Sequence, residues 1–118
     1  MKPRQLASIA AITLTLAFAG NTLAAGDAAA GKEKSVVCAS CHGESGISSM
    51  PALPGMVVPN LAGQHADYIA KALHDYQSGG RTNATMNGMA AGLSETDIEN
   101  LAAYYASLPG LKTVKKPE

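Results

Sequence analysis

The 118-residue sequence predicts an all-α fold of three to four helices with long loops, and three observations support this. Apolar residues recur at helical spacing in two segments, residues 66–77 and 94–108. No segment alternates apolar and polar residues as a half-buried strand does, and no internal repeat is present. With 47% hydrophobic and 15% charged residues, the chain fits one small soluble domain, which excludes a multidomain enzyme.

Residues 1–24 have the features of a secretory signal peptide. Lys2 and Arg4 precede an apolar stretch over residues 6–19, and small residues around Ala24 predict cleavage after that residue. An uncleaved membrane anchor is the alternative, but the apolar stretch is shorter than the roughly 20 residues that span a bilayer. We therefore expect a mature domain, residues 25–118, that is exported to the bacterial periplasm without a membrane anchor.

The first helix is expected from Ala28 to about Ala39, with Asp27 as its N-cap. Gly31 lies inside this helix, where glycine costs up to about 1 kcal/mol relative to alanine. This position predicts that another helix crosses closely there.

A long loop follows, over residues 43–63. It contains three prolines and shows no sustained periodicity. Structureless segments of this length are uncommon in small domains unless they are functional, so we expect it to wrap over a ligand that supplies part of the core. The second helix is expected over Ala66–Gln77 and ends at the Gly79–Gly80 pair.

The segment from Ser78 to Leu93 is glycine-rich and is predicted to be irregular. Ser94 then begins the clearest helix, because Ser94 and Asp97 have the spacing of a capping box. Its apolar face continues to Leu108, and the proline and glycine that follow end it. The tail over residues 112–118 is expected to fray.

Composition narrows the function. Nine basic and nine acidic residues give a formal net charge of zero, and no basic run suits a phosphate backbone, so nucleic acid is not an expected partner. The chain has no tryptophan, one phenylalanine and four tyrosines. So few aromatic side chains suggest that another group supplies bulk in the core.

Cys38, Cys41 and His42 form a C-x-x-C-H sequence, the attachment signature of c-type haem. Two thiols three residues apart on one helical turn can form thioethers with the two vinyl groups of a porphyrin. The next residue then directs an imidazole at the iron. One short segment thereby attaches the ring and supplies its proximal ligand.

Three other interpretations need only part of this motif. A structural disulfide would use the two cysteines alone, and a thioredoxin-like redox pair belongs to a βαβ setting that this all-α pattern lacks. Zinc would require four ligands. His65 and His74 are nine residues apart rather than at zinc-binding spacing, and no second cysteine pair is present.

Residues 26–108 resemble a class I c-type cytochrome. Beyond the haem motif, Pro59-Asn60-Leu61-Ala62-Gly63 is similar to the family's P-N-L-x-G segment, and Met86 before a tyrosine-containing terminal helix resembles its distal-ligand region. The nearest types are small single-haem bacterial cytochromes and one half of the tandem two-haem periplasmic cytochromes. Only one haem motif is present, so the resemblance implies one covalently bound haem c and the cytochrome c fold.

The resemblance also implies roles for individual residues. His42 and Met86 would be the axial iron ligands, and the Pro59 carbonyl would accept a hydrogen bond from His42. Met89 competes with Met86, but the family places its distal methionine eight residues ahead of the helix cap at Ser94, which favours Met86. The family's crossing of first and last helices would account for Gly31.

Other polar and sulfur-containing residues have weaker claims. His65 and His74 are expected on the surface or in hydrogen bonds rather than on the metal. Met50 and Met56 are expected to pack against the edge of the macrocycle. Arg81 could neutralise a haem propionate but needs no such role.

The leading functional hypothesis is a periplasmic one-electron carrier, an electron-transfer protein rather than an enzyme, that exchanges electrons with redox protein donors and acceptors. A second hypothesis is the cytochrome subunit of a larger periplasmic dehydrogenase, such as a sulfide-oxidising flavoprotein. A terminal oxidase is a further possible partner. A third hypothesis, a peroxidase or gas sensor with an open iron position, is disfavoured by Met86.

Overall fold

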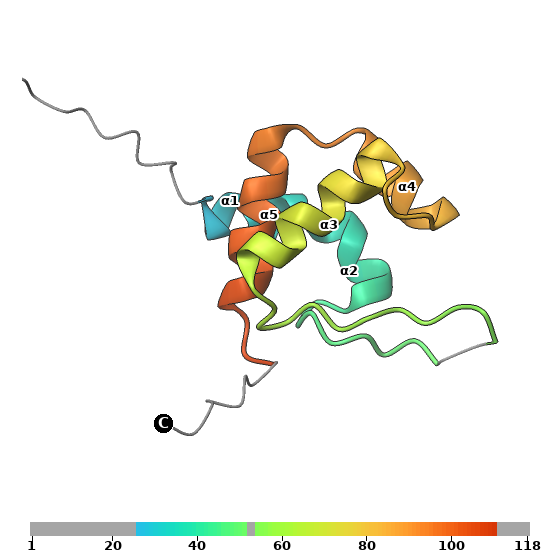
Figure 1. Cartoon of the computed structure of the whole chain (residues 1–118). Coiled ribbons are helices and arrows are strands. Elements are labelled where there is room, and N and C mark those ends of the chain that lie inside the picture. The colour runs from blue at the N-terminus through green and yellow to red at the C-terminus, as the bar shows by residue number, and fades with distance from the viewer. Residues whose placement is uncertain (1–25, 52–53, 111–118) are drawn as a thin grey trace, which may run out of the picture.

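The computed structural model describes residues 26–51 and 54–110 (Figure 1). The expected signal peptide, its cleavage after Ala24 and the expected frayed tail all lie outside the described residues. Within the described residues, no helix has the length and apolar character needed to cross a membrane.

The fold is all-α, as predicted, with five helices in the described part of the chain rather than three or four. In chain order they are α1 (Ala28–Lys34), α2 (Val36–His42), α3 (Ala66–Ser78), α4 (Ala84–Ala91) and α5 (Glu95–Ser107). The last helix is the centre of the arrangement, because both α1 and α3 pack against it (Figure 1). The loop from residue 43 to 63 carries no helix where it is described.

The single first helix expected over residues 28–39 is wrong, because the segment forms two helices that break at Ser35. The Ser35 hydroxyl donates to the Lys32 carbonyl oxygen at 2.8 Å, and the Ser35 amide is shared between Gly31 and Lys32. A serine that bonds back to the preceding turn competes with the helical ladder. Helix α2 continues to His42, beyond the end expected near Ala39, so the whole C-x-x-C-H motif lies on α2.

The predicted crossing at Gly31 is confirmed. A Cβ placed on Gly31 would lie 2.6 Å from the carbonyl carbon of Asn100 and 2.8 Å from Cβ of Tyr104, both on α5. Only glycine allows the two backbones to approach so closely. The Asn100 side chain also accepts a hydrogen bond from the Asp27 amide at 2.7 Å, at the start of α1.

The helix termini confirm the capping predictions. Asp27 accepts from the Ala29 and Ala30 amides, and Ser94 and Asp97 form the reciprocal capping box. Gly79 ends α3 with a left-handed conformation, at φ 80°. These contacts satisfy backbone groups that helix ends leave unpaired.

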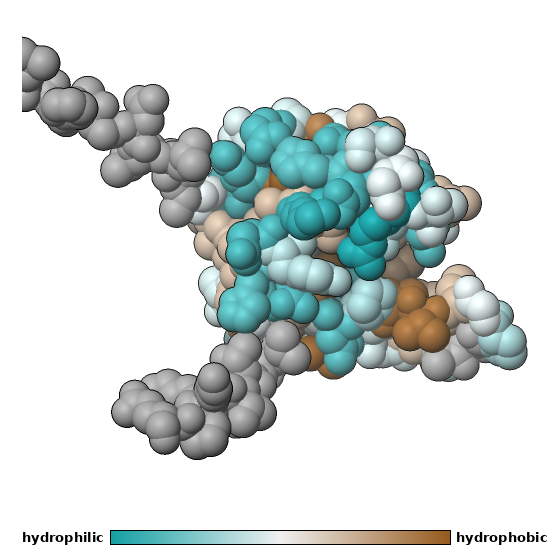
Figure 2. Space-filling view, viewed as in Figure 1, coloured by the Kyte–Doolittle hydropathy of each residue, from teal (hydrophilic) through white to brown (hydrophobic). Residues whose placement is uncertain are grey.

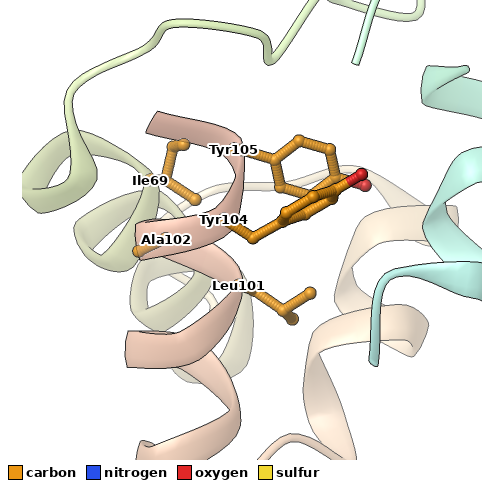
Figure 3. Close-up of a cluster of buried hydrophobic side chains, with 5 residues drawn as sticks. All are labelled: Ile69, Leu101, Ala102, Tyr104 and Tyr105. Carbon is orange, nitrogen blue, oxygen red and sulfur yellow. The ribbon is translucent and has the colours of Figure 1, made fainter. Parts of the chain in front are cut away.

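A small apolar core lies between α3 and α5 (Figure 3). Its buried members are Ile69, Leu101, Ala102, Tyr104 and Tyr105. Figure 3 shows the two tyrosine rings side by side, with their hydroxyl groups pointing in the same direction. Few large side chains are completely buried in the described residues, which is the shortage of bulk expected from the composition.

The irregular structure expected over residues 78–93 is only partly correct, because residues 84–91 form α4. Asn83 is its N-cap, and the side-chain oxygen accepts from the Met86 amide at 3.0 Å. Alanine and methionine favour helix strongly enough to include Gly88 in the interior. Met86 therefore lies in a helix rather than in the expected loop.

Candidate functional site

A cavity of about 480 Å³ lies between α2, the 43–63 loop, α3 and α4. Its size is within the range of small-molecule and cofactor sites. Side chains from all these segments line it, and most of its surface is apolar. Figure 2 shows apolar surface over the loop between α2 and α3, where Met56 and Val57 are exposed. The cavity is therefore an apolar site with an apolar margin.

One wall of the cavity is formed by α2, which carries Cys38, Cys41 and His42. The two cysteines are one helical turn apart, are partly buried and form no disulfide. Gly43 follows with φ 81°, so the chain turns away immediately after His42. A Cβ at Gly43 would collide with the Ile47 backbone, so this tight exit requires glycine.

The imidazole of His42 is oriented by the loop. Its Nδ1 atom lies 2.8 Å from the Pro59 carbonyl oxygen, and His42 is only 7% exposed. A carbonyl can only accept, so Nδ1 donates its hydrogen, and in the neutral imidazole the other ring nitrogen, Nε2, carries a lone pair. This is the arrangement by which a ligating histidine is held and made more basic.

Pro59 is itself held by contacts between the two arms of the loop. The Leu61 and Ala62 amides donate to the Gly46 carbonyl at 2.8 and 3.0 Å. The Asn60 side chain accepts from the Ser48 amide at 2.8 Å. These bonds tie the segment that follows Pro59 to the residues that follow α2, and so keep the carbonyl beside His42.

The chemistry of the thiols fits covalent attachment better than a metal site of their own. Within residues 26–51 and 54–110, no three His, Cys, Asp or Glu side chains converge as metal ligands would. Burial raises the pKa of the Cys38 thiol, which disfavours the thiolate that a metal ion would require in the unmodified chain. Both thiols lie on the cavity wall, where they can reach the edge of a bound ring.

Met86 and Met89 of α4 line the same cavity. Met86 is partly buried, whereas Met89 is 50% exposed. Their spacing of three residues places them on one face of the helix. The cavity thus has an imidazole on α2 and two thioether sulfurs on α4, a donor set suited to a haem iron.

Tyr105 adds an independent indication that the cavity is a binding site. Its hydroxyl oxygen is buried, and although the Ser35 and Cys38 side chains are close to it, no group among the described residues meets it with hydrogen-bond geometry. The residue lines the cavity beside Cys38, and burial raises its pKa above the ordinary value. Buried hydroxyl groups are nearly always paired, so this orphan group is consistent with a missing polar partner in the cavity.

The remaining candidate residues separate into two groups. His65 is the exposed N-cap residue of α3, and His74 lies 3.3 Å from Glu95; neither histidine lines the cavity. The other three remaining candidates, Met50, Met56 and Arg81, do line the cavity. Arg81 also lies over the Tyr76 ring, 4.9 Å from its centroid, which gives its guanidinium a structural contact.

Sequence reasoning missed two amide side chains that hold α4. Gln77 of α3 donates to one carbonyl of α4 and one just after it, and Asn87 of α4 donates to one carbonyl of α3 and one just after it. The spacing of Asn83 and Asn87 hints at a helix cap, but nothing in the sequence indicates contacts between α3 and α4.

Comparison with known proteins identifies the family of this arrangement. The cytochrome c family, described as "Cytochrome c", matches residues 24–109. Cytochrome c4 of Pseudomonas aeruginosa is 43% identical over 99 residues, which cover 84% of this chain and 47% of that protein. Cytochrome c-554(548) of Halomonas halodenitrificans is 44% identical over 86 residues, which cover 70% of this chain and 98% of that protein.

The solved structures agree. Reduced recombinant cytochrome c4 from Pseudomonas stutzeri superposes with a TM-score of 0.57 at 36% identity, over 70% of this chain and 50% of that one. The chain spans about half the length of the c4 relatives that it matches, and nearly all of cytochrome c-554(548).

Proposed function

The chain belongs to the cytochrome c family, and we propose that it is a periplasmic one-electron carrier with one covalently attached haem c. One observation carries the proposal. The motif histidine, with its Nδ1 atom bonded to a carbonyl, shares a cavity with both motif cysteines and with two methionines of another helix. The chain can thus hold the ring, supply a ligand on one side and offer another from a separate element.

In this proposal Cys38 and Cys41 would hold the ring through thioether bonds, and His42 would supply a nitrogen ligand to the iron. The bond to Pro59 fixes the imidazole plane and leaves Nε2 free to bind a metal. Because α2 is one continuous helix through the motif, covalent attachment and ligand direction are determined by the same seven residues.

We propose that Met86 rather than Met89 would supply the second ligand of the haem iron. The family spacing from Ser94 favours Met86, and its partly buried side chain supports the choice. Met89 is half exposed, which is more consistent with a contact at the cavity margin. Histidine and methionine ligation raises the reduction potential of a haem iron.

A bound haem c supplies a reversible one-electron couple; the protein must exclude water and leave an edge accessible to partners. Val37, Val57 and Met89 line the cavity and are exposed, at 63%, 76% and 50%. An apolar margin of this kind suits brief contacts with redox proteins, which use small interfaces. We therefore propose redox proteins of the periplasm as donors and acceptors.

Potentiometric titration of the purified holoprotein tests the proposal. A carrier with both axial positions occupied should follow a single one-electron curve, and its reduced form should bind carbon monoxide poorly. Two redox steps, rapid carbon monoxide binding or peroxide turnover would contradict it. Purification in a tight complex with a flavoprotein would instead indicate a dehydrogenase subunit.

A further inference from the structure

Helix α4, which carries both candidate methionines, is weakly anchored by apolar contacts. Ala90 is its one buried residue, and the other positions are exposed or partly buried. No main-chain hydrogen bond in the described segments joins α4 to another helix. Something else must therefore hold this helix at the cavity, since apolar burial ordinarily provides most of the packing energy of a short helix.

Asn87 attaches the middle of α4 to the end of α3. Its side-chain nitrogen donates to the Tyr76 carbonyl at 2.6 Å and to the Arg81 carbonyl at 2.9 Å. Its side-chain oxygen accepts from the Asn83 amide at 2.7 Å, at the start of α4. The Asn87 side chain thus makes three hydrogen bonds, two donated and one accepted, with the end of α3 and the connection to α4.

Gln77 makes the reciprocal attachment from α3. Its side-chain nitrogen donates to the Ala90 carbonyl at 2.9 Å and to the Leu93 carbonyl at 2.8 Å. Tyr76 and Ala90 lie in the last turns of their helices, where carbonyls lack the amide partner of the helix interior, and the Ala90 carbonyl also accepts from the Leu93 amide at 3.0 Å. The two amides therefore bond to carbonyls at helix ends and attach α4 to α3 at two points, Asn87 and Ala90.

Neither amide residue lines the cavity, whereas Met86, one residue before Asn87, does. We propose that Asn87 and Gln77 are positioning residues for the sixth iron ligand, acting through α4. They form an amide clamp, Asn87 with Gln77, that keeps the methionine at the iron. The inference rests on the proposed function, because it requires a methionine ligand from α4.

Imidazole binding to the ferric holoprotein measures how firmly the clamp holds the methionine at the iron. Imidazole can take the sixth position of the ferric protein only when α4 moves the methionine away. Removal of the two donated bonds in Asn87→Ala should make that movement easier and raise imidazole affinity roughly tenfold. The ferric charge-transfer band of methionine ligation should weaken, while covalent haem content stays unchanged. Gln77→Ala should act in the same direction.

Asn100→Ala is the matched control. It removes the bond between Asn100 and the Asp27 amide, which joins α5 to the start of α1 and does not involve α4. Its global stability should fall, yet its imidazole affinity should equal that of the wild type. Equal affinity in all three variants and the wild type, or an increase in Asn100→Ala as large as in Asn87→Ala, would overturn the clamp.

The ferric spectra distinguish a failure of the clamp from a failure of the proposed methionine ligand. A methionine charge-transfer band that persists unchanged in both clamp variants refutes the inference but leaves the proposed function intact. A wild-type protein without that band refutes the methionine ligand, and the clamp with it.

Discussion

Replacement of Gly31 by alanine tests the packing that organises the fold. The added Cβ would lie 2.6 Å from the Asn100 carbonyl carbon and 2.8 Å from Tyr104 Cβ. The Asn100 carbonyl oxygen would lie closer still. Favourable carbon contacts are about 3.5–4.0 Å, so α1 and α5 must separate by at least about 1 Å. Overpacking costs about 3 kcal/mol where backbone must move, and alanine returns up to about 1 kcal/mol of helix propensity.

The net loss of about 2 kcal/mol should lower the melting temperature by about 8–16 °C for a domain of this size. Guanidinium unfolding of the ferric holoprotein, followed by circular dichroism, measures the loss. Gly88→Ala is the matched control, because Gly88 is also inside a helix and its added Cβ would meet nothing within 4 Å. It should stabilise by up to about 1 kcal/mol. Equal stabilisation by both substitutions would refute the close crossing.

Three further predictions concern the haem, the core and the capping box. Intact mass should show residues 25–118 plus one haem, and Cys38→Ala or Cys41→Ala should sharply reduce holoprotein; an unmodified thiol pair would contradict this. Haem-free protein should lack a cooperative thermal transition, because the described core buries few large side chains; a melting curve like that of the holoprotein would refute this. The pKa of Asp97 is lowered mainly by its hydrogen bond with the Ser94 amide and next by its hydrogen bond with Lys34. The ionised Asp97 carboxylate therefore contributes stability above the ordinary carboxyl pKa, and this contribution is lost as pH falls through the lower pKa of the folded state. Asp97→Asn should therefore be less stable than the wild type near neutral pH, and the difference should shrink below about pH 4 in paired unfolding curves; a constant difference would refute the assignment.

Local signals made much of this structure predictable. The spacing of Cys38, Cys41 and His42 is contained within one helical turn, so the sequence alone indicates the motif. Ser94 with Asp97, and Gly31 inside a helix, likewise carry their physical reason within a few residues. The partner of Gly31 came from the family resemblance, since nothing local identifies α5.

The errors arose where local preferences compete or distant residues meet. The break at Ser35 depends on whether its hydroxyl bonds to the Lys32 carbonyl, a choice that composition does not determine. Helix α4 was not predicted because Gly88 disfavours a helix. In the structure, the Asn83 cap and the contacts with α3 outweigh the cost of that glycine. The amide of Gln77 gives no signal at all, since its two partners are at least 13 residues away.

The most direct test of the account compares Met86→Leu with Met89→Leu in the ferric holoprotein. Leucine keeps the approximate volume of methionine and removes the sulfur. The account predicts that Met86→Leu loses the weak charge-transfer band at the red edge of the spectrum and lowers the reduction potential, while Met89→Leu changes neither. The reverse result would show that Met89 is the iron ligand. An unchanged band in both variants would contradict a haem with a methionine ligand as the basis of electron transfer.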